Sequence, residues 1–178
     1  MTREAIAVLP YDPQWPRVFD RERLLLERVL EPWLDHGVHH IGSTAVPGLA
    51  AKPVIDMIAG VRDLEAARSA CDGLATIGYE LAPHRPDVAH HFAKPGFGLH
   101  LTEVGSTLWR ERLGFRDTLR ANPELAAEYE ALKLRLARES PDIQTYTAAK
   151  RAFVHRVLTG ADVDFAWRDE FSAAGQSQ

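Results

Sequence analysis

One short stretch, residues 39–61, holds the residues best suited to chemistry. Gly42, Ser43 and Thr44 follow an apolar run, and a glycine turn beside hydroxyl groups can bring backbone N–H donors close to a phosphate. Asp56 stands in a second apolar run, among valine, isoleucine and methionine. An unpaired carboxylate there would be costly to desolvate, so it needs a cation or several hydrogen-bond donors as partners.

Two interpretations of Asp56 stay open. In the structural one, its carboxylate accepts hydrogen bonds from the Ser43-Thr44 turn or pairs with Lys52, and so holds the loop in place. In the functional one, Asp56 binds Mg²⁺ for a nucleotide triphosphate, because Mg²⁺ prefers carboxylate oxygens and substrate phosphates. Lys52 lies between the turn and the acid and is placed to reach a phosphate as a point charge.

The chain also has eight histidines, four of them in two adjacent pairs, which suggest an alternative metal site. Zinc sites combine histidines with an acid, and neighbouring residues of a strand face opposite sides, so each pair can contribute one ring. The candidate ligands, all expected on adjacent strands, are one of His39 and His40, one of His90 and His91, His100 and Asp56. Such a site would favour metal-dependent hydrolysis with zinc.

Composition limits the classes of protein to consider. The chain has 178 residues and a net charge of −4, which is enough for one domain over residues 1–178 and gives no general attraction to nucleic acid. Cys71 is the one cysteine and cannot form an internal disulfide. No apolar run is long enough to cross a membrane, and the first residues do not resemble a secretory signal. We therefore expect a cytoplasmic protein with a small-molecule ligand.

The elements that must position these residues follow from hydrophobic periodicity and from Pro and Gly punctuation. Helices are predicted over residues 12–30, 64–78, 106–122, 123–140 and 142–158, and strands over residues 38–42, 54–61, 79–82, 88–94 and 98–104. The order places strands early and most helices late, which predicts an α+β fold with a mixed sheet of about five strands, flanking helices and a helical C-terminal part.

Three separated segments, HIGSTAVPGLAAKPVIDM, FAKPGFGLHL and LGFRDTLRANPELAAEYEALK, together resemble the GrpB family. That family is similar to the domain appended to some bacterial dephospho-CoA kinases, and the resemblance implies a nucleotidyltransferase-like fold. In that fold the Gly-Ser turn precedes a strand that bears two acids separated by one residue. Here Ile58 replaces the second acid, which weakens the case for two-metal phosphoryl transfer. Glu103 on a later strand is a candidate third acid, although it faces opposite to His100.

Several cations lie at positions that match the family motifs or stand beside them. Lys94, at a strand end, would add positive charge opposite the turn. Arg116 and Arg120 are four residues apart on one predicted helix, so they project together and could clamp a phosphate, or else make packing and salt-bridge contacts. Lys133 and Lys150 are expected on exposed helix faces.

The sequence thus predicts binding of a nucleotide or other phosphorylated ligand at the Gly42-Ser43 turn, with Mg²⁺-dependent nucleotidyl transfer as the accompanying chemistry. The alternatives are a non-catalytic binding module, which Ile58 favours, and the histidine and aspartate hydrolase. The predicted ligand-binding residues are Gly42, Ser43, Thr44, Lys52, Lys94, Arg116 and Arg120; the metal ligands are Asp56 and His100; and the catalytic residues are Asp56 and Ser43.

Overall fold

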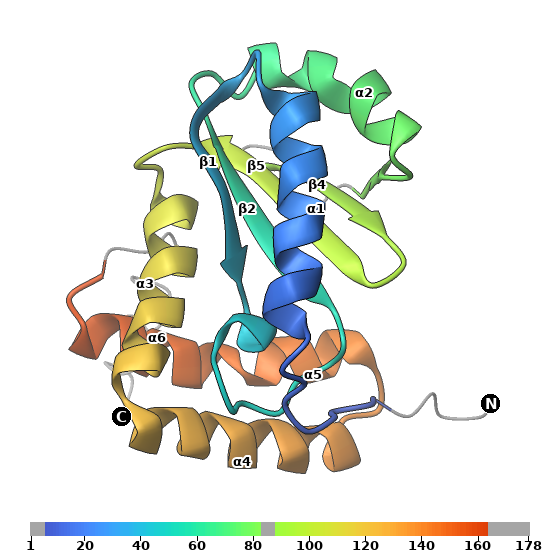
Figure 1. Ribbon diagram of the computed structural model, residues 1–178. Coiled ribbons are helices and arrows are strands. Elements are labelled where there is room, and N and C mark those ends of the chain that lie inside the picture. The colour runs from blue at the N-terminus through green and yellow to red at the C-terminus, as the bar shows by residue number, and fades with distance from the viewer. Residues whose placement is uncertain (1–5, 83–87, 164–178) are drawn as a thin grey trace.

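The computed structural model describes residues 6–82 and 88–163, which form one mixed sheet with helices on both faces and at one end (Figure 1). The sheet has five strands in the order β1-β2-β5-β4-β3. The strands are β1 (Leu34–Ile41), β2 (Ile55–Val61), β3 (Glu80–Leu81), β4 (His90–Lys94) and β5 (Phe97–Glu103). The helices are α1 (Trp15–Leu30), α2 (Cys71–Thr76), α3 (Thr107–Ala121), α4 (Pro123–Glu139), α5 (Ile143–Ala149) and α6 (Arg151–Gly160), with short 3₁₀ turns at Ser43–Ala45 and Ala66–Ala70.

The central strand β2 divides its side chains between two faces of the sheet, as the alternation along a strand requires. Ile55, Met57 and Ala59 join the main core, which α1 covers. Ile58 points the other way and packs against Trp109 of α3. Asp56 is two residues before Ile58 on the same strand, so its side chain also lies on the α3 face. Strand β2 is antiparallel to β1 and parallel to β5, so the beginnings of β2 and β5 and the end of β1 lie together.

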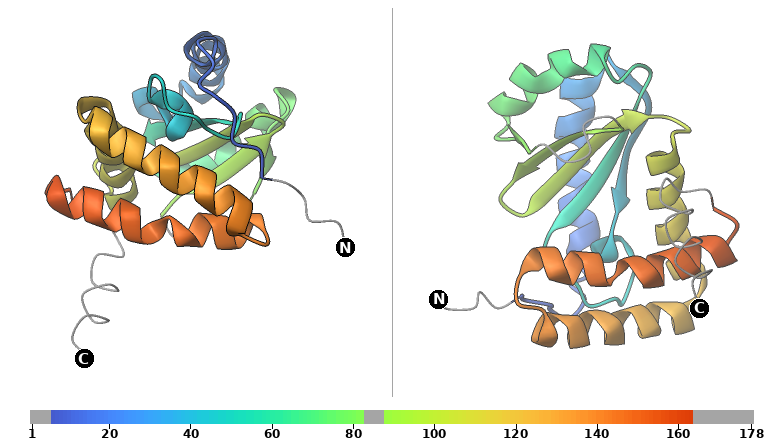
Figure 2. Two further views of the ribbon diagram at one scale, coloured as in Figure 1. Left: turned by 90° about the horizontal axis from the view of Figure 1, so that it is seen from below. Right: turned by 180° about the vertical axis from the view of Figure 1, so that it is seen from behind.

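The helices α4, α5 and α6 gather at that end of the sheet (Figures 1 and 2). They are joined to the loop after β1 by a second core, in which Val46 and Leu49 pack against Tyr129, Phe153 and other side chains. Asp142 begins α5 by accepting a hydrogen bond from the backbone N–H of Thr145 at 2.7 Å. This layer therefore covers the end of the sheet where β2 begins and where Asp56 lies.

The predicted α+β fold with a mixed five-stranded sheet is confirmed. Three details differ. Strand β1 starts earlier than expected, and its register shifts between Leu34 and Val38. The helix expected over residues 64–78 is a 3₁₀ turn followed by the short α2, and the helix expected over residues 142–158 is broken at Lys150 into α5 and α6. Among residues 6–82 and 88–163, no helix has the length and apolar composition of a membrane span.

Candidate functional site

The Asp56 carboxylate lies between two glycines of the neighbouring strands. A Cβ atom added at Gly42, directly after β1, would come within 2.8 Å of Asp56 Oδ2. One added at Gly98 of β5 would come within 2.9 Å of Asp56 Oδ1. The carboxylate therefore fills space that any other residue at these two positions would occupy, which explains the need for glycine on both sides.

The turn after β1 approaches this carboxylate because Gly42 has a φ of +71°, which other residues rarely adopt. Ser43 and Thr44 then form one 3₁₀ turn. Ser43 is half-buried and is a hydrogen-bond partner of the Tyr129 hydroxyl on α4. Burial is the main reason that the pKa of Tyr129 is raised, and the Asp56 charge raises it further. Ser43, Asp56 and Tyr129 thus belong to one cluster.

Three cations act on the same carboxylate. Burial raises the pKa of Asp56, while the positive charges of Arg112, Lys52 and Lys150 lower it. Burial, with the like charges of Lys52 and Arg112, lowers the pKa of Lys150 to about 8, and the charge of Asp56 opposes that change. Three cations thus act electrostatically on Asp56, and one of them, Arg112, also lies 3.8 Å from the buried Glu111 carboxylate.

The break between α5 and α6 positions Lys150, and α3 positions Arg112. Lys150 is the last residue before α6 begins, and its ammonium lies 4.2 Å from the centre of the Tyr146 ring. Arg112 Nε is buried and has no hydrogen-bond partner within the described residues. A buried donor without an acceptor is unfavourable, so an anionic ligand that accepted from Arg112 Nε would remove a cost.

Thr44 and His40 have structural partners away from Asp56. His40 lies on the α1 face of the sheet, where its ring stacks on Phe19 at 4.8 Å between centroids. Its Nε2 is 2.9 Å from Thr44 Oγ1, and that hydroxyl donates to the carbonyl of Val54 at 3.1 Å. Burial, together with the charges of two arginines, lowers the pKa of His40 to about 4. The imidazole is therefore neutral at physiological pH and fixes the turn.

Arg116 and Arg120 do project together from α3, but towards backbone carbonyls. Arg116 donates to the carbonyl of His40 at 2.9 Å, and Arg120 donates to the carbonyl of Ala45 at 2.8 Å. Arg116 also donates to the Asp117 carboxylate at 2.7 Å. Arg116 and Arg120 thus make the packing and salt-bridge contacts that were the alternative to a phosphate clamp, and these contacts hold the turn against α3. Their role in binding a ligand stays a prediction.

Lys94 and Glu103 do not join Asp56, because the side chains of both lie on the face of the sheet that α1 covers. Lys94 Nζ lies 2.7 Å from Glu22 Oε1 of α1, and the Tyr79 hydroxyl donates to the same oxygen at 3.1 Å. Glu103 accepts a hydrogen bond from the backbone N–H of Leu64 at 3.2 Å. The expectation that Lys94 faces the turn is therefore not met, and Glu103 does not supply a third acid beside Asp56.

His91 and His100 do share the α3 face with Asp56. Their rings stack with centroids 4.5 Å apart, and Gly98 Cβ, if present, would come within 3.7 Å of His91 Nε2. His40, in contrast, is on the other face, and His39, which shares the α3 face, lies against His36 and Trp109. Ile58 is fully buried in an apolar group. Within the described residues, no group of three or more His, Cys, Asp or Glu side chains is placed to hold a metal ion.

Sequence reasoning missed Arg112, Gly98 and the role of Lys150. Arg112 precedes Arg116 by four residues, so the helical spacing that selected Arg116 and Arg120 would also have selected Arg112. Lys150 was expected on an exposed face, and Lys133 likewise. Lys133 is only 2% exposed and donates to the carbonyl of Ala50. No local signal marks either lysine, because both are buried by contacts with distant segments.

The overall fold has a counterpart among known proteins. Residues 5–159 match the family described as GrpB protein, and the chain belongs to that family. The Glutamate-rich protein GrpB of Alkalihalophilus pseudofirmus is 34% identical over 164 residues, covering 86% of this chain and 94% of that protein. A crystal structure of the conserved protein GrpB from Enterococcus faecalis has 33% identity and a TM-score of 0.80, over 87% of this chain and 96% of that one.

The family also extends to a larger protein. A dephospho-CoA kinase of Mycolicibacterium paratuberculosis is 30% identical over 186 residues, which cover 84% of this chain and 44% of the kinase. The resemblance to a domain found in some dephospho-CoA kinases is thereby confirmed.

Proposed function

We propose that this GrpB-family protein binds a phosphorylated small molecule, such as a nucleotide, at the turn of Gly42 and Ser43. The observation that carries the proposal is the convergence of Lys52, Lys150 and Arg112 on one carboxylate. Cations crowded in a partly desolvated site repel one another, and a bound anion relieves that repulsion. Phosphate suits such a site because it accepts several charge-assisted hydrogen bonds at once.

Arg112 Nε gives a second reason to expect an anionic ligand, because it is buried and makes no hydrogen bond, although it lies 3.8 Å from the buried Glu111 carboxylate. In a nucleotidyltransferase-like fold, the phosphate chain would lie between the Gly42 turn and the cations of α3 and the α5–α6 break. Ser43 would then donate its hydroxyl to the ligand in place of Tyr129, its present hydrogen-bond partner. Asp56 would orient the neighbouring lysines.

The donor set does not fit a protein-held Mg²⁺ ion. Asp56 is one carboxylate among three cations, whereas Mg²⁺ sites use one or two carboxylates together with substrate phosphates and little competing positive charge. Ile58 is buried against Ile41 and Trp109, so the strand offers no second ligand. We therefore propose a binding module in preference to nucleotidyl transfer, and we derive no transfer step. A zinc site that uses Asp56 and His100 is disfavoured for the same electrostatic reason.

Calorimetric titration of the protein with ATP, AMP and adenosine tests the proposal. We expect affinity to rise with the number of phosphates. Lys150→Met should weaken ATP binding by about tenfold or more, because it removes a partly desolvated partner of the anion. Arg135→Met on α4 removes the same charge from an exposed ion pair and should have little effect. Equal affinity for ATP and adenosine, or an unchanged Lys150→Met variant, would contradict anion binding.

The Asp56→Asn variant separates binding from metal-dependent chemistry. If the site binds the anion without a metal, removing the carboxylate charge should tighten ATP binding whether or not Mg²⁺ is present. If Asp56 holds Mg²⁺ for the ligand, the same change should weaken binding, and only in the presence of Mg²⁺. Pyrophosphate release by the wild-type protein with ATP and Mg²⁺ would establish nucleotidyl transfer and overturn the preference for a binding module.

A further inference from the structure

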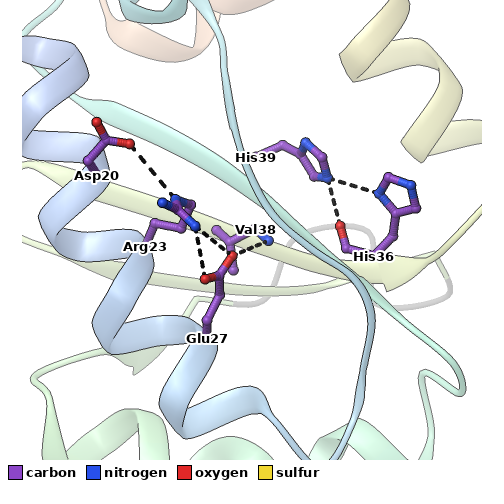
Figure 3. Close-up of polar contacts among 6 residues, drawn as sticks. All are labelled: Asp20, Arg23, Glu27, His36, Val38 and His39. Carbon is purple, nitrogen blue, oxygen red and sulfur yellow. Dashed lines mark hydrogen bonds and ion pairs between the residues drawn. The ribbon is translucent and has the colours of Figure 1, made fainter.

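His36 and His39 of β1 turn their rings towards each other on the side of the strand that faces away from α1 (Figure 3). His36 Nδ1 lies 3.2 Å from His39 Nε2. His39 Nε2 is also 2.7 Å from the His36 carbonyl oxygen. On the other side of the strand, Glu27 of α1 accepts hydrogen bonds from Arg23 and from the backbone N–H of Val38.

An irregularity in β1 brings the two rings together. Residues three apart on a regular strand face opposite sides, so their side chains cannot meet. Here the register shifts between Leu34 and Val38, and Gly37 has a φ of +67°. A bulge of this kind re-aims the side chains next to it. The pair of imidazoles therefore depends on a specific backbone feature of the edge strand.

We propose that His36 Nδ1 and His39 Nε2 form a two-ligand site for a divalent transition metal ion of the Zn²⁺, Ni²⁺ and Cu²⁺ class. Imidazole nitrogens bind Zn²⁺ at about 2.0–2.1 Å, and two such ligands of a tetrahedral ion are about 3.3 Å apart. The observed separation of 3.2 Å is close to that spacing. This inference is independent of the proposed function.

The surroundings hold the rings and keep them available. The Trp109 ring meets both imidazoles edge-on, with centroids 5.6 Å from His36 and 5.2 Å from His39. Trp109 is buried, so this support is rigid, whereas His36 is exposed and open to an ion from solvent. In the metal-free chain His39 Nε2 donates its proton to the His36 carbonyl oxygen, because a carbonyl only accepts. Metal binding replaces that hydrogen bond, and the ring then carries its proton on Nδ1.

Metal binding requires imidazole rings that are deprotonated at the coordinating nitrogens. Within the described residues, no third His, Cys, Asp or Glu joins the pair to complete a metal site. Water completes the coordination, so the ion should be exchangeable and should stabilise the bulge.

Titration of the full-length, untagged protein with Zn²⁺ tests this site. Removing a direct ligand should cost at least as much as removing a supporting residue, so His36→Ala and His39→Ala should each weaken Zn²⁺ binding by about tenfold or more. His155→Ala, which removes an imidazole from α6, should leave that affinity unchanged. Zn²⁺ should also raise the melting temperature of the wild type more than that of either β1 variant. Equal affinity and an equal shift in all the proteins would overturn the proposal.

A measurement on the wild-type chain alone guards against misfolding of the variants. Imidazole NMR signals, assigned to individual histidines, should show His36 and His39 shifting first as Zn²⁺ is added. If other histidines shift first, such as His91 and His100, the metal binds elsewhere and the proposal fails. If no histidine signal moves at Zn²⁺ concentrations that change the melting temperature, it fails as well.

Discussion

Asp56 and Gly98 are direct partners on the parallel strands β2 and β5, and the Asp56 carboxylate lies where a side chain at position 98 would stand. An added Cβ would be 2.9 Å from Oδ1, closer than atoms of this kind approach in proteins. This relationship makes the strand pairing itself a determinant of the carboxylate position, and it supplies the first test of the site.

Replacing Gly98 by alanine should displace the Asp56 carboxylate while leaving the fold intact. The backbone at Gly98 does not have a positive φ, so alanine fits the strand conformation and even adds some strand stability. We expect ATP affinity to differ from that of the wild type, because the Asp56 charge is displaced although it is retained, while thermal unfolding stays cooperative. Calorimetry measures the ATP affinity, and thermal unfolding measures the stability. An unchanged ATP affinity would show that Asp56 is not part of the ligand site.

Replacing Gly42 by alanine should both strain the backbone and crowd the carboxylate. The strain at a φ of +71° costs about 1–2 kcal/mol of folding free energy. Gly48→Ala is the matched control, because Gly48 has a φ of +79° but nothing within 4 Å of an added Cβ. Both variants should lose stability in urea unfolding, Gly42→Ala the more because its Cβ also crowds the Asp56 carboxylate, and only Gly42→Ala should also change ATP affinity. Equal ligand affinity in the two would show that the contact with Asp56 is unimportant.

Ligand affinity should depend on pH through Lys150. Its pKa is lowered to about 8, so its ammonium is charged below that pH and neutral above it. Lys52 and Arg112 lower the pKa of Lys150, and Asp56 raises it. A bound anion would also raise the pKa of Lys150. We therefore expect ATP binding to weaken as the pH rises through and above 8. Lys150→Arg should keep its affinity over that range, and a profile identical to that of the wild type would assign the titration to another group.

Replacing Glu22 by glutamine should reduce stability without changing the ligand site. Glu22 is buried and pairs with Lys94 at 2.7 Å on the α1 face of the sheet. Removing one partner of a buried pair costs about 3 kcal/mol. Glu65→Gln breaks an exposed pair with Arg68 and should cost less than about 1 kcal/mol. Urea unfolding measures both, and a Glu22→Gln variant with altered ATP affinity would mean that the two faces are coupled.

Lys133 should make stability rise with pH. Burial lowers its pKa from 10.5 in the unfolded chain to about 7 in the folded protein. Between those values the unfolded chain binds the proton and the folded protein does not, so the free energy of unfolding increases with pH there. The slope is up to about 1.4 kcal/mol per pH unit. Lys133→Met lacks this contribution, so the stability of the wild type relative to the variant should increase from pH 7 to pH 10. A difference that does not change with pH would refute a role for Lys133 in the pH dependence.

Local patterns in the sequence account for much of the fold. Alternation along residues 54–61 places Asp56 and Ile58 on one face of a strand, and the structure keeps them there. The Pro95-Gly96 hairpin forms between β4 and β5, where Gly96 has a φ of +81°. These features depend only on neighbouring residues, because turn geometry and side-chain alternation are fixed within a few positions of the chain.

The partners of each side chain were decided by tertiary packing. Periodicity gives the face of an element but not what covers that face, so Lys52 acts on Asp56 whereas Lys94 pairs with Glu22 on the α1 face of the sheet. Arg112 and Lys150 reach Asp56 because α3 and the α5–α6 break pack over the end of β2.

The sequence by itself determined the α+β architecture, the glycine turn and a lone acid within an apolar strand. Only the tertiary structure decided that Arg112 and Lys150 join Lys52 around Asp56, and that a bulge in β1 brings His36 and His39 together. The physical reason is that backbone conformation and amphipathic patterns are local properties of the chain. Burial and electrostatic interaction arise between segments that are distant in sequence and meet only after the cores have formed.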